Sequence, residues 1–250
     1  MANLRDIKKR ISSVTSTKQI TRTMEMVSTA KIRRALDRAH QAEPYKTALT
    51  DVMLTVATDA SIASDNPMLA VHEEPKRGLV IAIASDRGLA GGFNVNVDRE
   101  CERIIREWRN EGIEGQIITC GRKPSEYFSS RGNVVMKFEG FSADPRLEDA
   151  RMIADYICDS YVAGELDRVE VVYHHARNRV DQQLRVEHLL PLDPEMVAMA
   201  HGPRKNEDEG PKRVSSSFKF IPSAQHVLGE LVPSYVLTII HQALIDSAAA

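Results

Sequence analysis

The sequence is poor in the residues that interrupt helices and build large cores. Aromatic residues make up 5% of its 250 residues, no glycine precedes Gly78, and Pro44 is the only proline before Pro67. Glycine and proline are strong stop signals, so their scarcity allows one very long helix at the N-terminus. The three cysteines form no CxxC pair, and no histidine cluster has zinc spacing, so we expect no metal site and reduced, partly buried thiols in a cytosolic-type compartment. These cysteines are Cys101, Cys120 and Cys158.

The sequence also lacks a long uninterrupted hydrophobic run. The longest apolar stretch near the C-terminus, residues 231–245, is broken by a proline and several polar residues. We therefore expect no transmembrane segment. The N-terminus is rich in arginine, serine and threonine, as organelle transit peptides are, but its helical pattern continues through residue 56 without a break that resembles a cleavage site.

The N-terminal segment, residues 1–58, has the pattern of a single helix. Apolar or small residues recur mostly at steps of three and four, which predicts one stripe along one side of the helix. Some 50 helical residues would extend roughly 75–80 Å. Because a helix this long cannot bury its stripe in its own domain, we expect it to pack along another helix or inside a partner. The stripe consists of Leu4, Ile7, Ile11, Val14, Ile20, Met24, Val27, Ala35, Ala39, Ala42, Leu49, Met53 and Val56.

The charge of this segment points to an acidic partner. Residues 1–46 contain eleven Lys and Arg against four Asp and Glu, a net charge of +7, whereas the other 204 residues carry −9. The overall net charge of −2 therefore conceals a strongly polarised chain. A solvated polar face is the plainer explanation for any single lysine, but it accounts poorly for the excess over the whole segment.

Residues 76–221 alternate between strand and helix patterns. Apolar runs at 79–84, 116–120, 134–138 and 169–173 predict strands, and the segments 95–109, 123–130 and 146–163 predict helices. Residues 180–192 look extended, and 218–221 predict a last short strand. Strands that alternate with helices indicate a small Rossmann-like α/β domain with parallel strand pairs.

The C-terminal segment, residues 222–250, predicts another helix. Ser223 is a plausible N-cap, and Pro233 should kink the helix or mark where its regular part begins. A folded middle domain brings its two ends together, so the two terminal helices can pair as an antiparallel coiled coil. The predicted fold class is thus α/β, with a long coiled coil of the N- and C-terminal helices.

The only motif that suggests a small ligand is a glycine-rich turn between a strand and a helix. Gly88, Gly91 and Gly92 lie there, but neither the GxGxxG spacing nor a GK[ST] ending is present. We interpret them as a tight structural turn that needs positive φ. A small α/β enzyme that binds a nucleotide at this turn remains the alternative hypothesis.

Other polar residues favour structural roles. His174 and His175 follow a strand without a second ligand pair at metal spacing, and Asp144, Glu148 and Asp149 suit the start of a helix. A third hypothesis, a basic coiled coil that binds nucleic acid, is weakened because no tyrosine or phenylalanine occurs before Tyr45 and no leucine heptad follows the basic stretch.

Three stretches resemble one known family. Residues 7–14 (IKKRISSV) leading into 17–27 (TKQITRTMEMV) resemble the N-terminal helix of the gamma subunit of F-type ATP synthases, bacterial type. Residues 85–94 (SDRGLAGGFN) look like the strand-to-helix turn of that family. The segments 189–192 and 235–244 match its later landmarks, so the similarity covers the chain from residue 2 to 250.

The resemblance implies a non-catalytic rotor shaft without a cofactor. Its terminal helices would enter the ring of alpha and beta subunits, and its α/β domain would form a foot against the epsilon subunit and the membrane c-ring, on the cytoplasmic side of the cell membrane. Proton flow would turn the shaft and drive ATP synthesis at the beta subunits. The resemblance implies a stretch facing the alpha–beta ring that contains Lys8, Lys9, Arg10, Lys18, Arg22, Met24, Lys31, Arg33 and Arg34.

The family's C-terminal helix continues beyond the point that matches Ala250, so we expect an incomplete C-terminal helix here. A helix over residues 223–250 spans about 40 Å at ~1.5 Å per residue. Running antiparallel, it can cover the N-terminal helix only from about Ala35 to Val56. We therefore expect the tip from residue 4 to residue 24 to be bare, and residues 1–24 to be either frayed or held by a partner.

Overall fold

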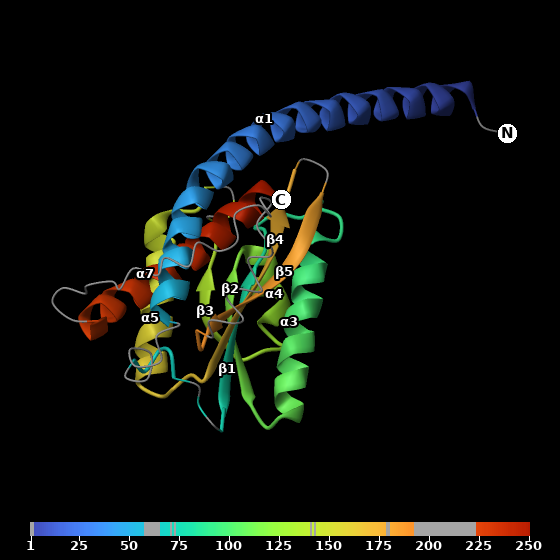
Figure 1. The fold of residues 1–250 in the computed structure, drawn as a ribbon. Coiled ribbons are helices and arrows are strands. Elements are labelled where there is room, and N and C mark those ends of the chain that lie inside the picture. Colours follow the sequence, from blue (N-terminus) through green and yellow to red (C-terminus); the bar gives the residue numbers. More distant parts are fainter. Residues whose placement is uncertain are drawn as a thin grey trace.

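A computed structural model describes residues 3–57, 66–70, 72, 74–140, 142, 144–178, 181–192 and 224–250. Helix α1 (Leu4–Ala57) has 54 residues and continues through Pro44, which confirms the long N-terminal helix. Figure 1 shows α1 as a curved rod whose first half projects away from the rest of the protein. The rod therefore has a part that lies on the protein and a part that does not.

The centre of the protein is a five-stranded sheet in the order β3-β2-β1-β4-β5. Its strands are β1 (Arg77–Ile83), β2 (Glu114–Cys120), β3 (Val134–Phe138), β4 (Arg168–Ala176) and β5 (Gln182–Leu190). The first four strands are parallel, and β5 runs antiparallel to β4. This arrangement confirms the predicted α/β class and the extended segment before Pro191. The strand predicted at 218–221 and the N-cap predicted at Ser223 lie outside the described residues.

Helices cover both faces of the sheet. Helices α3 (Phe93–Asn110) and α4 (Arg122–Phe128) pack on one face, and α5 (Leu147–Val162) and α7 (Ala224–Ala249) pack on the other. Along β1, Leu79 and Ile81 enter one core while Val80 and Ala82 enter the other, and all four side chains are fully buried. A continuous apolar strand of this kind is expected when both faces of a parallel sheet are covered.

Helix α7 packs against both the sheet and α1. Val232, Val236 and Ile240 are buried in the core that α7 shares with α5 and β4. At the end of α7, Ala249 packs with Ala35 of α1, whereas Met53 belongs to the core around α7, so the two helices run antiparallel. The expected pairing of the terminal helices is confirmed, and Pro233 lies inside α7 without ending it.

By length and composition alone, residues 226–249 could cross a membrane. However, more than half of that segment is buried inside the protein. An apolar core helix gives the same signal, and we interpret α7 in that way.

The predicted structural roles of several polar residues are confirmed. Asp149 accepts a hydrogen bond from the backbone N–H of Arg146 at the start of α5, 3.2 Å away. The ring of His174 is buried with Nε2 3.1 Å from the Phe93 carbonyl oxygen, and His175 Nδ1 lies 2.6 Å from a carboxylate oxygen of Asp246 on α7. All three cysteines are free and buried, and burial raises the pKa of each thiol.

Candidate partner-binding surface

The first half of α1 exposes every side chain from residue 4 to residue 31. The nine residues implied as partner-binding, from Lys8 to Arg34, are all exposed. Among the described residues, none of the eight cations in this set forms an ion pair with a carboxylate. This half thus carries an excess of cations without counter-charges among the described residues, and such a field attracts acidic groups.

The same half exposes large apolar side chains, and they do not form one stripe as predicted. The six-residue step from Val14 to Ile20 turns the helix by about 240° beyond a full turn, at about 100° per residue. Leu4 to Val14 therefore face one direction, and Ile20, Met24 and Val27 face another. The prediction of a single stripe was wrong, because the six-residue step changes the direction in which the apolar side chains point.

The second of these apolar faces lines an open groove of about 450 Å³. Six residues of α1 between Gln19 and Ser28 form one wall, and Arg87 from the turn after β1 forms the other. This groove combines apolar contact with one guanidinium group. It lies between the projecting half of α1 and the turn after β1.

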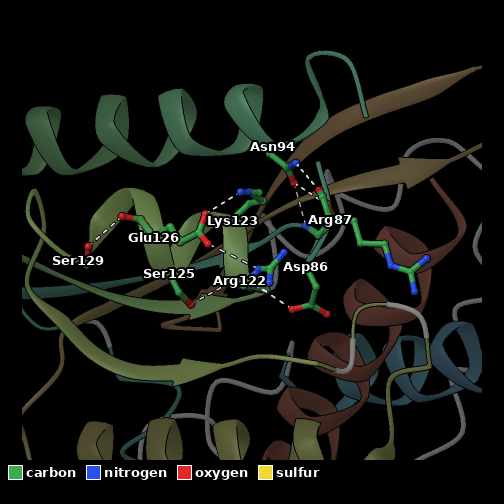
Figure 2. A network of polar contacts seen from close by, with 10 residues as sticks. Asp86, Arg87, Asn94, Arg122, Lys123, Ser125, Glu126 and Ser129 are labelled. Carbon is green, nitrogen blue, oxygen red and sulfur yellow. Dashed lines mark hydrogen bonds and ion pairs between the residues drawn. The ribbon is translucent and has the colours of Figure 1, made fainter. Parts of the chain in front are cut away.

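The turn that carries Arg87 is held by the carboxylate of Asp86 (Figure 2). One carboxylate oxygen accepts hydrogen bonds from the backbone N–H groups of Arg122 and Gly140, both at 2.9 Å. The other accepts from the hydroxyl of Ser142 at 2.7 Å and from its N–H at 3.1 Å. Partial burial opposes ionisation of Asp86, but these hydrogen bonds outweigh it and lower the pKa of the carboxyl below its ordinary value.

The loops joined by Asp86 all follow carboxyl ends of parallel strands. The approach is close at Gly121, which has φ +116° and where an added Cβ would lie 2.5 Å from the Ala84 carbonyl oxygen. Only glycine fits both this backbone conformation and this space. The three loops at this end of the sheet are therefore tied together by one negative charge.

Asn94 completes the turn from the start of α3. Its side-chain oxygen accepts a hydrogen bond from the N–H of Ser85 at 2.9 Å, and its amide nitrogen donates to the Arg87 carbonyl oxygen at 3.2 Å. The side chain of Arg87 extends away from this network (Figure 2). The turn thus fixes the backbone of Arg87 and leaves its side chain free to reach the groove.

The prediction of a tight turn that needs positive φ is confirmed at one of its three glycines. Gly91 has φ +55°, but Gly92 caps α3 with φ −81°, and Gly88 is outside the left-handed region. The second positive φ belongs to Leu89, at +63°, whose side chain is 96% exposed. An exposed leucine in this conformation is costly for folding and is common where backbone strain serves binding.

Comparison with known proteins identifies the family. A family model described as ATP synthase matches residues 3–250. The chain is 40% identical over 250 residues to the ATP synthase gamma chain of Pelotomaculum thermopropionicum, covering all of this chain and 82% of that one. It is 36% identical over 254 residues to the gamma chain of Chlorobaculum tepidum, with the same coverage. The chain belongs to the ATP synthase gamma-chain family.

Solved structures share the fold of this gamma-chain family member. The central stalk and c-ring structure of the Tetrahymena thermophila mitochondrial ATP synthase matches with a TM-score of 0.67 at 19% identity, covering 92% of this chain and 93% of that one. The rotor of the Euglena gracilis mitochondrial enzyme matches with a TM-score of 0.57 at 17% identity, covering 98% and 85%. At such identities the similarity supports the fold.

Two surface residues were missed from the sequence. Arg87 and Leu89 lie in the turn that we interpreted only through its glycines. A leucine in a glycine-rich turn, where a polar residue is usual, was the available signal for an exposed apolar side chain. No pattern in the sequence indicates that Arg87 faces residues 19–28 of α1, because that contact depends on the curvature of the rod.

Proposed function

We propose that residues 4–34 of α1 are the part of the rotor shaft that turns inside the ring of alpha and beta subunits. As a gamma chain, the protein is the central rotor shaft of an ATP synthase, which couples ion flow through the membrane ring to ATP synthesis and hydrolysis. The observation that carries the proposal is the exposed half of α1, with large apolar side chains and unpaired cations on one rod. Surfaces of this kind and size in a monomer are typical of protein interfaces.

The proposal assigns the remaining surface to the base of the rotor. Residues 76–221 form the foot against the epsilon subunit and the membrane c-ring, residues 1–58 form the shaft, and residues 222–250 support it. The complex is membrane-associated, and the chain would lie on the cytoplasmic side of the cell membrane.

We further propose that the chain catalyses no bond-making step itself. In open α/β sheets, ligands bind beyond the carboxyl ends of the strands. Here the Asp86 carboxylate occupies that position and accepts hydrogen bonds from backbone N–H groups of the neighbouring loops. A phosphate group would meet a negative charge there, which disfavours the alternative of a nucleotide enzyme at Gly88–Gly92. Equilibrium dialysis against ATP and NAD tests this point: stoichiometric binding that Gly91→Val abolishes would support the enzyme.

The shaft assignment is tested by Met24→Lys. Met24 and Met152 are exposed to the same extent, 50% and 51%, but Met24 lies in the shaft and Met152 on α5 of the foot. A lysine at position 24 adds a charge to an apolar face that must slide, so we expect normal assembly with alpha, beta and epsilon subunits but less ATP-driven proton pumping per ATP hydrolysed. Met152→Lys should leave this ratio closer to wild type. Wild-type coupling in Met24→Lys vesicles would contradict the proposal.

A further inference from the structure

A buried polar cluster joins α1 to the sheet. Lys46 of α1 donates hydrogen bonds to Glu187 of β5, with Nζ 3.2 Å from one carboxylate oxygen and 3.5 Å from the other. The side chains of Lys46 and Glu187 are only 12% and 11% exposed. The hydroxyl of Tyr173, a fully buried residue of β4, donates to Glu187 at 2.6 Å. Helix α1 and the two adjacent strands β4 and β5 thus meet at one carboxylate, although Lys46 and Glu187 lie 141 positions apart in the sequence.

Apolar side chains make part of the remaining contact between α1 and the domain, beside a hydrogen bond between the side chains of Thr50 on α1 and Tyr235 on α7. Ala35 and Ala39 pack their small side chains against their surroundings, and Met53 enters the main core. Contacts between smooth apolar surfaces are non-directional, so they resist separation better than rotation or sliding. A second ion pair, between Arg38 and Asp144, is 42% and 81% exposed, and water competes with it.

The cluster favours a single placement of α1 on the sheet. Burial and the neighbouring Glu187 carboxylate raise the pKa of Tyr173, so its hydroxyl keeps the proton that it donates. A buried charge without its partner is costly, so an arrangement of α1 that separates Lys46 from Glu187 is penalised. Buried ion pairs add little net stability, and fixing a register is their best-documented role.

We infer that Lys46, Glu187 and Tyr173 are positioning residues that set the direction of α1 relative to the foot. They thereby make the shaft follow the rotation of the base of the rotor. This inference rests on the proposed rotor function. It concerns a contact inside the chain, not the surface that meets the ring.

We call the contact of Lys46 with Glu187 and Tyr173 the joint. A small tilt of α1 at the joint displaces the N-terminal tip by a large distance, because the joint lies near the base of a long rod. From Lys46 to Leu4 the helix rises about 63 Å, so a tilt of about 10° at the joint moves the tip by about 10 Å. Without the Lys46 cluster, sideways loads on the tip would be resisted by apolar packing on both sides of position 46, by one neutral hydrogen bond and by one exposed ion pair. A directional contact at position 46 limits that movement at its origin.

The test uses the double variant Lys46→Met/Glu187→Gln, which removes both charges together and keeps an acceptor for Tyr173. Replacing both members of a buried pair is usually tolerated, so the variant should fold. Arg38→Met/Asp144→Asn is the matched control, because that pair also joins α1 to the foot but is exposed. Tyr173→Phe, which removes a single hydroxyl, is a second and milder variant.

The first measurement is the distance distribution between spin labels at Ala30→Cys and Glu165→Cys in the full chain. Both positions are exposed, and the native thiols are buried and label slowly. A tilt of about 10° at Lys46 moves residue 30 by about 4 Å, so the distribution should widen by about that amount in the double variant. Tyr173→Phe should widen it less and the control not at all. An unchanged width in both test variants would overturn the inference.

The second measurement is proton pumping per ATP hydrolysed in the assembled complex. The double variant should show a lower ratio than wild type and control, with an unchanged midpoint of thermal unfolding. A wider distribution with a wild-type ratio would overturn the role in coupling. Failure of the rotor proposal has a different signature, because the wild-type chain would then not assemble with the ring at all, whereas the label distances would still report on the joint.

Discussion

The two halves of α1 differ in which side chains they bury and which they expose. The covered half, residues 32–53, buries small side chains such as Ala35 and Ala39 against its own protein. The projecting half, residues 4–31, exposes large apolar side chains such as Ile11 and Ile20. Residue size alone would assign the larger side chains to the core. In α1, small residues lie where α7 approaches closely, and large exposed ones lie on the half that we propose as the partner-binding shaft.

The comparison also indicates that the covered half of α1 stabilises the fold, whereas the projecting half serves the proposed partner binding. The covered half is held by α7 and by the Lys46 cluster, whereas the projecting half contributes little to the stability of the isolated chain. Isolated helices gain most of their stability from tertiary packing. The projecting half is therefore expected to become fully stable only inside its partners, and fraying of residues 4–24 remains a prediction.

The largest expected effect comes from one substitution made in both halves. Met53 is 3% exposed and lies in the main core, whereas Met24 is half exposed in the groove. Met53→Ala should lower the free energy of unfolding by about 2–5 kcal/mol through lost burial and a cavity. Met24→Ala should change it by less than about 0.5 kcal/mol. Urea titration of the isolated chain measures both, and equal losses would break the comparison.

A second pair of variants tests the role of small residues. Ala39→Leu inserts three carbon atoms where α1 is buried, and overpacking should lower the free energy of unfolding by about 1–3 kcal/mol. Ala30→Leu adds the same atoms to the exposed half and should change it by less than about 0.5 kcal/mol. If Ala39→Leu were neutral in thermal and urea unfolding, close helix approach would not be the reason for alanine at this position.

The fold was predictable to the extent that it depends on local patterns. Apolar runs predicted the strands β1 to β4, the segment of β5 was predicted only as extended, and the absence of stop signals predicted α1. The region that α7 covers, from Ala35 to Met53, followed from helix length alone. These features depend on spacing and rise per residue, which the sequence contains directly.

The remaining features depend on tertiary contacts. Glu187 is 141 positions from Lys46, and no local rule pairs them. Helix α7 is apolar almost all round, so its pattern could not show that it packs on the sheet as well as on α1. The role of Asp86 was hidden because its partners lie in loops that meet only when the sheet forms. The nine residues implied as partner-binding are exposed, and their contacts with the ring remain a proposal.

The third prediction concerns the turn after β1, which faces the projecting half, and its expected effect on the free energy of unfolding is smaller. Asp86→Asn removes a charge that accepts several hydrogen bonds within the foot, and should lower the free energy of unfolding at pH 7 by about 1–2 kcal/mol. Because the pKa of Asp86 is lowered in the folded state, its contribution is present above the unfolded value of about 3.9 and is lost as the pH falls through the folded value. The gap between variant and wild type should therefore narrow at pH 3, and a constant gap in urea titrations from pH 7 to 3 would show that charge is not the cause.

The smallest expected effect lies near the boundary between the two halves. Arg38 pairs with Asp144 beside the point where α1 leaves the domain, and both side chains are largely exposed. Exposed pairs contribute about 0.2–1 kcal/mol and are screened by salt, so Arg38→Gln should lower the free energy of unfolding by that amount at low ionic strength and by less at 1 M NaCl. Arg34→Gln, four residues away in the helix but without an ion pair among the described residues, is the control. A loss above about 2 kcal/mol, or one that salt leaves unchanged, would mean that the covered half begins with a directional joint at Arg38, and that the Lys46 cluster does not hold α1 alone.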